Sequence, residues 1–189
     1  MKKPSLLVIL LTFFIDLVGF GIVMPILPVY TENFGAKGLM IGWVMASYSL
    51  MQMLFSPFWG RLSDRVGRRP ILLLSTAGAA VSYWMFAKAS AMTGSAGLWM
   101  VIGSRMLAGI FAANMAVASA YIADITPKEK RSARMGLVGM AIGFGFIFGP
   151  IIGAVSYDRL GITGPGWAAG ILCSVNFVMA FIFLKESRT

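Results

Sequence analysis

The feature that most constrains this chain is a series of apolar runs, each about 18 residues or longer and nearly free of charge. They cover residues 6–30, 40–59, 70–90, 97–123, 133–156 and 166–184. Such runs can cross a bilayer, and lipid offers no partner to backbone polar groups, so a spanning segment is a helix or part of a closed barrel. Barrel strands alternate apolar and polar residues over about ten positions, and these runs do not. The sequence therefore predicts an all-α integral membrane protein, one bundle of six transmembrane helices over residues 1–189.

The basic residues indicate how this bundle is oriented. Most of them lie at the two termini and in the second and fourth turns: Lys2, Lys3, Arg61, Arg65, Arg68, Arg69, Lys128, Lys130, Arg131, Arg134, Lys185 and Arg188. The other turns hold Lys37, Lys88 and Arg159. Since Lys and Arg accumulate in cytoplasmic loops, we expect both termini in the cytoplasm. The net charge of +9 then favours contact with anionic lipid and not with nucleic acid.

Several kinds of chemistry are absent from the sequence. The chain has no histidine and one cysteine, Cys173, which lies in the last apolar run. It therefore has no histidine ligand, no paired-thiol metal site and no internal disulfide. It also has no phosphate-binding Gly-Lys-Ser loop. We expect no enzyme activity, no cofactor and no metal.

Two charged residues lie well inside apolar runs, away from their ends. Asp16 is near the middle of the first run, and Arg105 lies within the fourth. A charge at this depth costs roughly 3 kcal/mol on insertion scales, and such residues usually mark ion or substrate pathways. Asp16 is the only acid well inside a run, so it is the leading candidate to carry a proton, with Arg105 tuning or relaying its charge. The alternative is a structural Asp16–Arg105 ion pair, and the two roles are compatible.

The turn after the second run has an ordered charge pattern, Gly60-Arg61-Leu62-Ser63-Asp64-Arg65-Val66-Gly67-Arg68-Arg69. A topological anchor needs basic residues there but no particular order. A charged latch that breaks during movement would need both the acid and the glycines.

This turn resembles the signature loop between helices two and three of the major facilitator superfamily. Three other segments agree with that family's motifs: residues 16–28 with the first-helix signature of its drug–proton antiporters, 105–109 with the fourth-helix motif, and 145–153 with the fifth-helix antiporter motif. With Ile122-Ala123-Asp124, the pattern is most similar to tetracycline-type exporters. The resemblance covers the whole chain, but only the N-terminal six helices of a family that normally has twelve.

The resemblance implies roles for individual residues and a place in the bacterial inner membrane. Proton coupling would involve Asp16 and Arg105. A cytoplasmic latch would comprise Gly60, Asp64, Arg65, Gly67, Arg68, Arg69 and Asp124. Gly145, Gly149, Pro150 and Gly153 would form the antiporter-like helix. From spacing alone, these glycines lie on one helix face and equally fit ordinary close packing.

Three polar residues within the runs are candidates for a substrate cavity: Gln52, Ser82 and Asn114. Each can instead bond to a neighbouring helix. Abundant aromatic residues and methionines suit an adaptable pocket for lipophilic compounds. Tetracycline exporters have an acid near the position of Ser82, which puts tetracycline itself in doubt.

Alternating access needs two bundles, and this chain has one. It either lacks a second bundle or pairs with a second copy as a homodimer. Asp64-Arg65-Val66-Gly67 and Asp158-Arg159-Leu160-Gly161 fit two inverted three-helix repeats. We expect a proton-coupled exporter of small lipophilic compounds. The alternatives are a truncated, non-transporting membrane module, and an importer or uniporter of the same fold.

Overall fold

The structure is a computed structural model that describes residues 6–187. Over this range the regular elements are all helical: α1 (Leu6–Val23), α2 (Leu27–Asn33), α3 (Leu39–Val66), α4 (Arg68–Ser90), α5 (Gly94–Ile110), α6 (Asn114–Asp124), α7 (Arg131–Leu160) and α8 (Gly164–Phe183), with short 3₁₀ turns at Lys128–Lys130 and Gly161–Thr163. The prediction of an all-α fold is confirmed.

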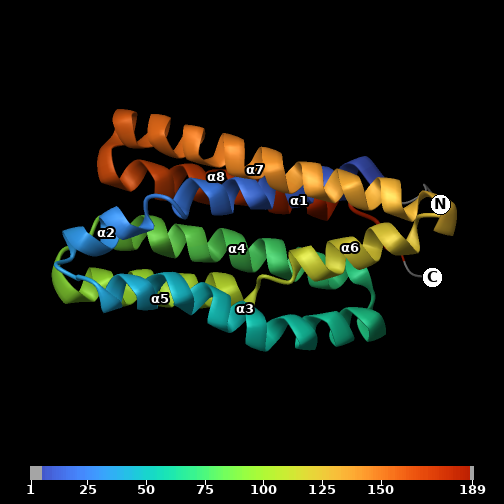
Figure 1. The fold of residues 1–189 in the computed structure, drawn as a ribbon, viewed down its shortest axis with the longest axis horizontal. Helices are drawn as coiled ribbons and strands as arrows, with labels where there is room; N and C mark the ends of the chain where they lie inside the picture. Colours follow the sequence, from blue (N-terminus) through green and yellow to red (C-terminus); the bar gives the residue numbers. More distant parts are fainter. Residues whose placement is uncertain (1–5, 188–189) are drawn as a thin grey trace.

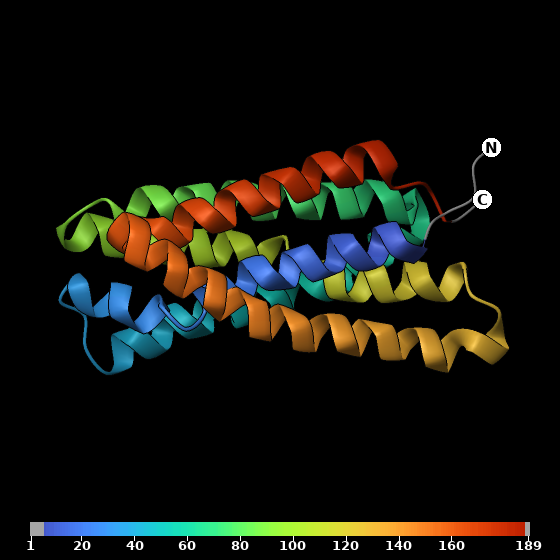
Figure 2. The same cartoon turned by 90° about the horizontal axis from the view of Figure 1, so that it is seen from above.

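The helices run along one common axis (Figure 1). Helices α1, α7 and α8 form one group, and α3, α4, α5 and α6 form the other (Figure 1). In the view from above, α8 runs alongside α4 (Figure 2). Packing of α4 against α8 joins the two groups, and α1 lies against both α7 and α8. The core between them has two apolar clusters, one around Tyr30, Phe86 and Val101 and the other around Ile9 and Tyr121.

The outer surface of the bundle is apolar. Large side chains such as Ile147 and Phe181 are more than half exposed, which suits contact with lipid and not with water. Five segments are long and apolar enough to cross a membrane: Leu6–Asn33, Leu39–Val66, Arg68–Ser90, Gly94–Asp124 and Lys128–Phe183. The last contains both α7 and α8, which the sequence analysis treats as separate spans, so the count of six stays a prediction.

Two expected spans are interrupted. The run 6–30 contains α1 and α2, because Pro25 has no N–H to continue the helix and restricts the residue before it. The run 97–123 contains α5 and α6, with a break at residues 111–113. Side chains satisfy the carbonyl groups freed there: Trp59 Nε1 donates to the Ile110 oxygen at 2.5 Å, and Ser75 Oγ donates to the Phe111 oxygen.

The basic residues gather at one end of the bundle, which we call the basic end. The start of α1, the α3–α4 turn, the α6–α7 turn and residues 184–187 all lie there (Figure 1). The opposite end holds α2 and the α4–α5 turn. Lys2, Lys3 and Arg188 lie outside the described residues. The two turns with the repeated sequence both end a long helix at a glycine with positive φ, Gly67 (106°) after α3 and Gly161 (68°) after α7. The inverted repeat itself stays a prediction.

Candidate functional site

A cavity of about 220 Å³ lies between the two helix groups. Helices α1, α3, α4, α5, α6 and α7 all contribute to its wall, as does the break between α5 and α6. Most of the lining is aromatic or apolar, and the polar groups are few: Phe13, Asp16, Leu17, Phe20, Tyr48, Gln52, Ala79, Tyr83, Ala108, Phe111, Ala112, Asn114, Met115, Ile142 and Phe146. A largely apolar pocket with a few convergent polar groups is the usual form of a small-molecule site.

Asp16 is the acidic group of this cavity. It comes from the middle of α1, and its Oδ1 accepts a hydrogen bond from Asn176 Nδ2 of α8 at 3.2 Å. The same amide nitrogen donates to the Thr12 backbone oxygen at 2.9 Å. Asn176 is fully buried, so it fixes the carboxyl group from behind and leaves its other oxygen toward the cavity. Nothing in the sequence marked Asn176, because an asparagine in an apolar run does not indicate which helix it will face.

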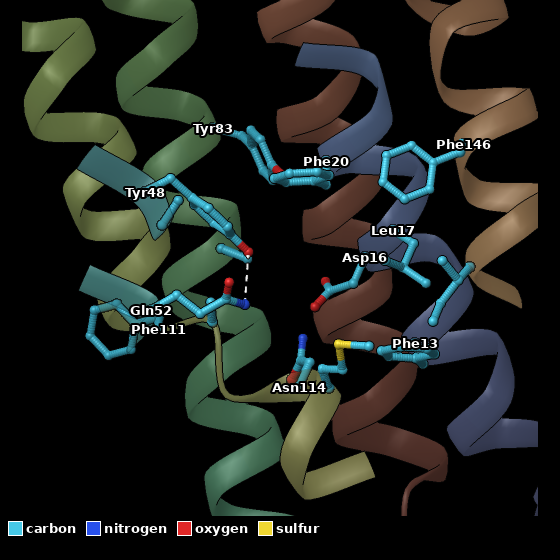
Figure 3. A pocket seen from close by; sticks show the side chains of 15 residues that line it. Phe13, Asp16, Leu17, Phe20, Tyr48, Gln52, Tyr83, Phe111, Asn114 and Phe146 are labelled. Atoms are coloured by element: carbon cyan, nitrogen blue, oxygen red, sulfur yellow. Dashed lines mark hydrogen bonds between the residues drawn. The ribbon is translucent and has the colours of Figure 1, made fainter. Parts of the chain in front are cut away.

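The other polar groups of the cavity point toward the same space (Figure 3). Gln52 Nε2 donates to Tyr48 Oη at 3.4 Å, one helical turn away on α3. Asn114 is the first residue of α6, and its Oδ1 is buried without a hydrogen-bond partner in the described chain. Of the three residues predicted to line a cavity, the structure brings Gln52 and Asn114 together with Asp16.

Ser82 lies elsewhere. Its side chain is fully buried, and its hydroxyl donates to the Ala79 oxygen of its own helix at 2.7 Å. It is not among the residues that line the cavity. Such a back-bond satisfies a hydroxyl within a helix, so Ser82 needs no ligand. The α4 residues that reach the cavity are Ala79 and Tyr83.

Arg105 lies behind the cavity wall and not in it. Its guanidinium carbon is 5.1 Å from the centroid of the Tyr83 ring and 5.0 Å from that of Phe86. The residue is 3% exposed, and its Nε and Nη2 have no hydrogen-bond partner within residues 6–187. No ion pair joins it to Asp16 in that range. The ring of Tyr83, which lines the cavity, therefore separates the guanidinium from the cavity.

The glycines of α7 position Asp16 by letting α1 approach closely. A Cβ on Gly145 would lie 2.6 Å from the Cβ of Leu17, and one on Gly149 would lie 2.6 Å from the Cα of Gly21. A Cβ on Gly153 would likewise come too close to the backbone oxygen of Ile22. Backbones this close require residues without side chains. Pro150 lies within α7, which continues past it to Leu160.

Arg68 is the centre of a charged cluster at the basic end. Its guanidinium bonds to Asp64 Oδ1 at 2.7 Å and to Asp124 Oδ2 at 3.1 Å, and it donates to Ser63 Oγ at 2.6 Å. The side chain is 10% exposed. It therefore ties the end of α3 and the end of α6 to the start of α4. We call Arg68, Asp64, Asp124 and Ser63 the Arg68 cluster.

The other residues predicted for the latch have different surroundings. Arg65 is exposed and makes no side-chain hydrogen bond or ion pair with any of residues 6–187. Gly60 has open space beside it, and its oxygen accepts from Ser63 Oγ at 2.8 Å. Gly67 has a φ of 106°, which few other residues adopt. A Cβ there would also meet Glu186 Oε2 at 2.6 Å.

Glu186 is a member of this region that the sequence analysis missed. Its carboxylate accepts the backbone N–H of Arg68 at 2.8 Å and of Arg69 at 3.1 Å, the first two amides of α4. An anion is favourable at a helix N-terminus. The Arg69 guanidinium bonds in turn to the oxygens of Leu184 and Phe181, at 2.8 and 3.0 Å. The sequence carried no clear signal for this contact, because the donors are backbone amides at a helix start and not basic side chains.

A membrane-spanning helical bundle that holds an aromatic cavity with a single carboxyl group is the architecture of a membrane transporter. The chain belongs to the major facilitator superfamily, because the sequence model of that family matches residues 9–189. It is thus a multi-pass protein of a transporter family and not an enzyme.

Individual relatives agree with this assignment. The chain is 37% identical over 187 residues to the tetracycline resistance protein, class E, of Escherichia coli, covering 97% of this chain and 44% of that protein. It is 31% identical to multidrug resistance protein 2 of Bacillus subtilis (strain 168), covering 98% and 45%. Among solved structures it resembles the human organic anion transporter MFSD10 (TETRAN), with a TM-score of 0.83 and 27% identity, over 97% of this chain and 48% of that one. The chain spans about half the length of the curated relatives that it matches.

Proposed function

We propose that this chain supplies one bundle of a proton-coupled exporter of small lipophilic compounds, which works by alternating access. The observation that carries the proposal is the cavity: aromatic walls for a lipophilic body and one carboxyl group, Asp16, to bind a proton or a cation. The similarity to tetracycline and multidrug resistance proteins supports export of drugs. The protein would lie in a bacterial inner membrane with the basic end in the cytoplasm, as the charge bias favours.

Asp16 is the proposed proton carrier. It faces the cavity, and Asn176 holds one of its oxygens. A carboxyl group at mid-membrane depth that both a proton and a substrate can reach lets the two compete for one site, and this competition couples them when the site is exposed to each side of the membrane in turn. Arg105 is the proposed modulator of that charge, acting from behind the Tyr83 ring.

The Arg68 cluster is the proposed latch. Its pairs join three helix ends, and a rigid-body movement of these helices would have to break them. Asp64 and Asp124 keep 56% and 33% of their side chains exposed, so water can replace the guanidinium at moderate cost. That is the behaviour expected of a contact that forms and breaks in each cycle.

Alternating access requires a second bundle. We propose that it is a further six-helix segment or a second copy of this chain. A second candidate function applies if neither kind of second bundle is present. In that case it is a membrane module that folds without completing a transport cycle.

The deciding experiment is transport by the purified chain in proteoliposomes with an imposed pH gradient, with its oligomeric mass measured in detergent. Gradient-driven movement of a fluorescent lipophilic dye by a dimer would support the exporter. A monomeric protein that moves no dye would support the non-transporting membrane module instead. Asp16→Asn is expected to abolish coupling to the gradient without loss of folding, and unchanged coupling would remove Asp16 from its role. Gln52→Ala is the matched control, since it alters the same cavity without removing a proton site.

A further inference from the structure

Asn176 is a fully buried polar residue in the interface between α8 and α1. Its Nδ2 donates two hydrogen bonds to α1, one to the Thr12 backbone oxygen at 2.9 Å and one to Asp16 Oδ1 at 3.2 Å. The orientation of the amide is fixed, because a backbone oxygen only accepts hydrogen bonds and therefore requires the nitrogen beside it. Asp16 thus faces two different surroundings, the cavity on one side and this amide on the other.

The oxygen of the Asn176 side chain shows that this arrangement has a cost. Oδ1 is buried and has no hydrogen-bond partner within residues 6–187, and the same is true of Thr12 Oγ1. Buried polar atoms are nearly always paired, and one that is not requires an explanation. An asparagine that served only to join two helices would gain by pairing its oxygen as well. Asn176 instead directs its nitrogen to α1, beside the acid that lines the cavity.

The contact between Asn176 and Asp16 discriminates between the two forms of the carboxyl group, because an amide nitrogen can only donate. A hydrogen bond to a charged acceptor is roughly twice as strong as one to a neutral acceptor, so Asn176 favours the ionised carboxylate. A proton that enters from the cavity binds to Oδ2, the oxygen that Asn176 does not hold. The bond to Oδ1 then weakens, and the change at the proton site reaches α8 through this one contact.

The ionisable groups around the carboxylate come from four helices: Tyr48 of α3, Tyr83 of α4, Arg105 of α5 and Cys173 of α8. The residues of α6 and α7 that line the cavity carry no ionisable group. None of the four forms a hydrogen bond or ion pair with Asp16 in the described part of the chain. Among residues 6–187, Asn176 is therefore the side chain that bonds directly to the carboxylate.

We propose that Asn176 is the positioning residue of the proton site: it holds the Asp16 carboxylate against α8 when no proton is bound and releases it when a proton binds. It thereby sets the proton concentration at which Asp16 loads, and it links loading to the contact between α1 and α8. The inference rests on the proposed role of Asp16 as proton carrier and adds the residue that regulates it.

The test is a pH titration of the purified chain in lipid bilayers, followed by infrared spectroscopy, which requires neither transport nor a second bundle. The carboxyl band of Asp16 is the one that disappears in Asp16→Asn. Asn176→Leu removes the donor and keeps a branched side chain of similar shape. Asp16 should then take up its proton at about tenfold lower proton concentration, a shift of about 1 pH unit toward higher pH, because a hydrogen bond to a charged group is lost.

Ser174→Ala is the matched control on the same helix. It also removes a bond between α8 and another helix, because Ser174 Oγ accepts from Trp84 Nε1 of α4 at 2.9 Å, and it leaves the contact with Asp16 intact. Its titration should coincide with that of the unmodified chain. Asn176→Ala, which adds no bulk, should shift the titration as Asn176→Leu does. It carries the test if the leucine variant fails to fold, as judged by gel filtration and circular dichroism.

The outcomes separate this inference from the proposed function. A titration that shifts in Asn176→Leu and not in Ser174→Ala supports the positioning role, even if proteoliposomes of the chain move no dye. An unshifted titration in Asn176→Leu, or equal shifts in the two variants, would overturn the inference and leave Asp16 as the proton site. If no carboxyl band that depends on Asp16 titrates, both the proton carrier and its positioning residue are wrong.

Discussion

Replacing Arg68 with alanine should destabilise the protein far more than replacing Arg65, which lies in the same turn. Arg68 has three side-chain partners, whereas Arg65, three residues earlier, is exposed and has none among residues 6–187. The two substitutions remove the same charge from the same turn. Their difference therefore isolates the contribution of the Arg68 cluster from that of net charge.

The magnitude follows from how exposed each partner is. The pair with Asp64, whose side chain is 56% exposed, contributes at most about 1 kcal/mol. The pair with Asp124, 33% exposed, contributes about 1 kcal/mol. The bond to the buried Ser63 hydroxyl is charge-assisted and contributes about 1.5 kcal/mol or more. Arg68→Ala should thus lower the free energy of unfolding by about 3 kcal/mol, and Arg65→Ala should lower it by about 0.5 kcal/mol or less. Arg68→Lys, which has one donor group in place of a fork, should fall between them.

The assay is unfolding in mixed micelles by added SDS, monitored by tryptophan fluorescence. The variants are compared at equal concentrations of protein and lipid. Trp59 lies one turn from the cluster on α3 and reports local as well as global loss of structure. Equal losses for Arg68→Ala and Arg65→Ala would refute the reasoning. So would a loss that disappears entirely in high salt, because salt screens the exposed pairs with Asp64 and Asp124 but not the buried bond to Ser63.

Three further predictions follow from the same packing. Glu186→Gln should weaken the hydrogen bonds to the first two amides of α4 and lower the local stability of that turn by about 1 kcal/mol. The amides there should exchange hydrogen faster, and unchanged exchange would contradict the prediction. Gly149→Ala should lower the free energy of unfolding by about 1–3 kcal/mol in the same SDS assay, because its Cβ meets α1. Gly143→Ala should have no such effect, because Gly143 has open space beside it. Equal effects of the two variants would exclude the close approach. Trp59→Phe should lose about 1–2 kcal/mol by leaving the Ile110 oxygen unpaired at the helix break, and a neutral result would mean that water satisfies that group.

Much of the fold follows from hydropathy, because lipid removes nearly every alternative to a long helix. Most ends of the predicted runs lie within a few residues of helix ends, but the second run stops at residue 59 whereas α3 continues to Val66, and the runs miss the two breaks. Pro25 and Pro28 marked the first break. The second, at residues 111–113, has no proline or glycine. It depends on Trp59 and Ser75 from two other helices, which bond the freed carbonyl groups. A feature held by tertiary partners cannot be found from local sequence.

The candidate site shows the same limit. Sequence reasoning identified Asp16 because a charge in lipid is costly wherever it faces. It placed Gln52, Asn114 and Ser82 together because all three are polar, but only two of them face the cavity, since helix rotation decides that. It missed Asn176 and Glu186, whose importance lies in their partners: Asp16 for the first and the start of α4 for the second.

The break also connects the two parts of the molecule that the proposed function needs. Helix α6 has eleven residues, with Asn114 in the cavity wall at its start and Asp124 in the Arg68 cluster at its end. The break at residues 111–113 separates α6 from α5, so we expect α6 to tilt as a rigid unit about it. Helix α4 likewise carries Arg68 at one end and Tyr83 in the cavity wall. We propose that breaking the Arg68–Asp124 pair removes one of the contacts that hold α6 to α4, and so favours opening of the wall between Asn114 and Tyr83. On this proposal the Arg68 cluster and the cavity are coupled through α6, which has one at each end, and an uninterrupted span 97–123 would couple them less directly.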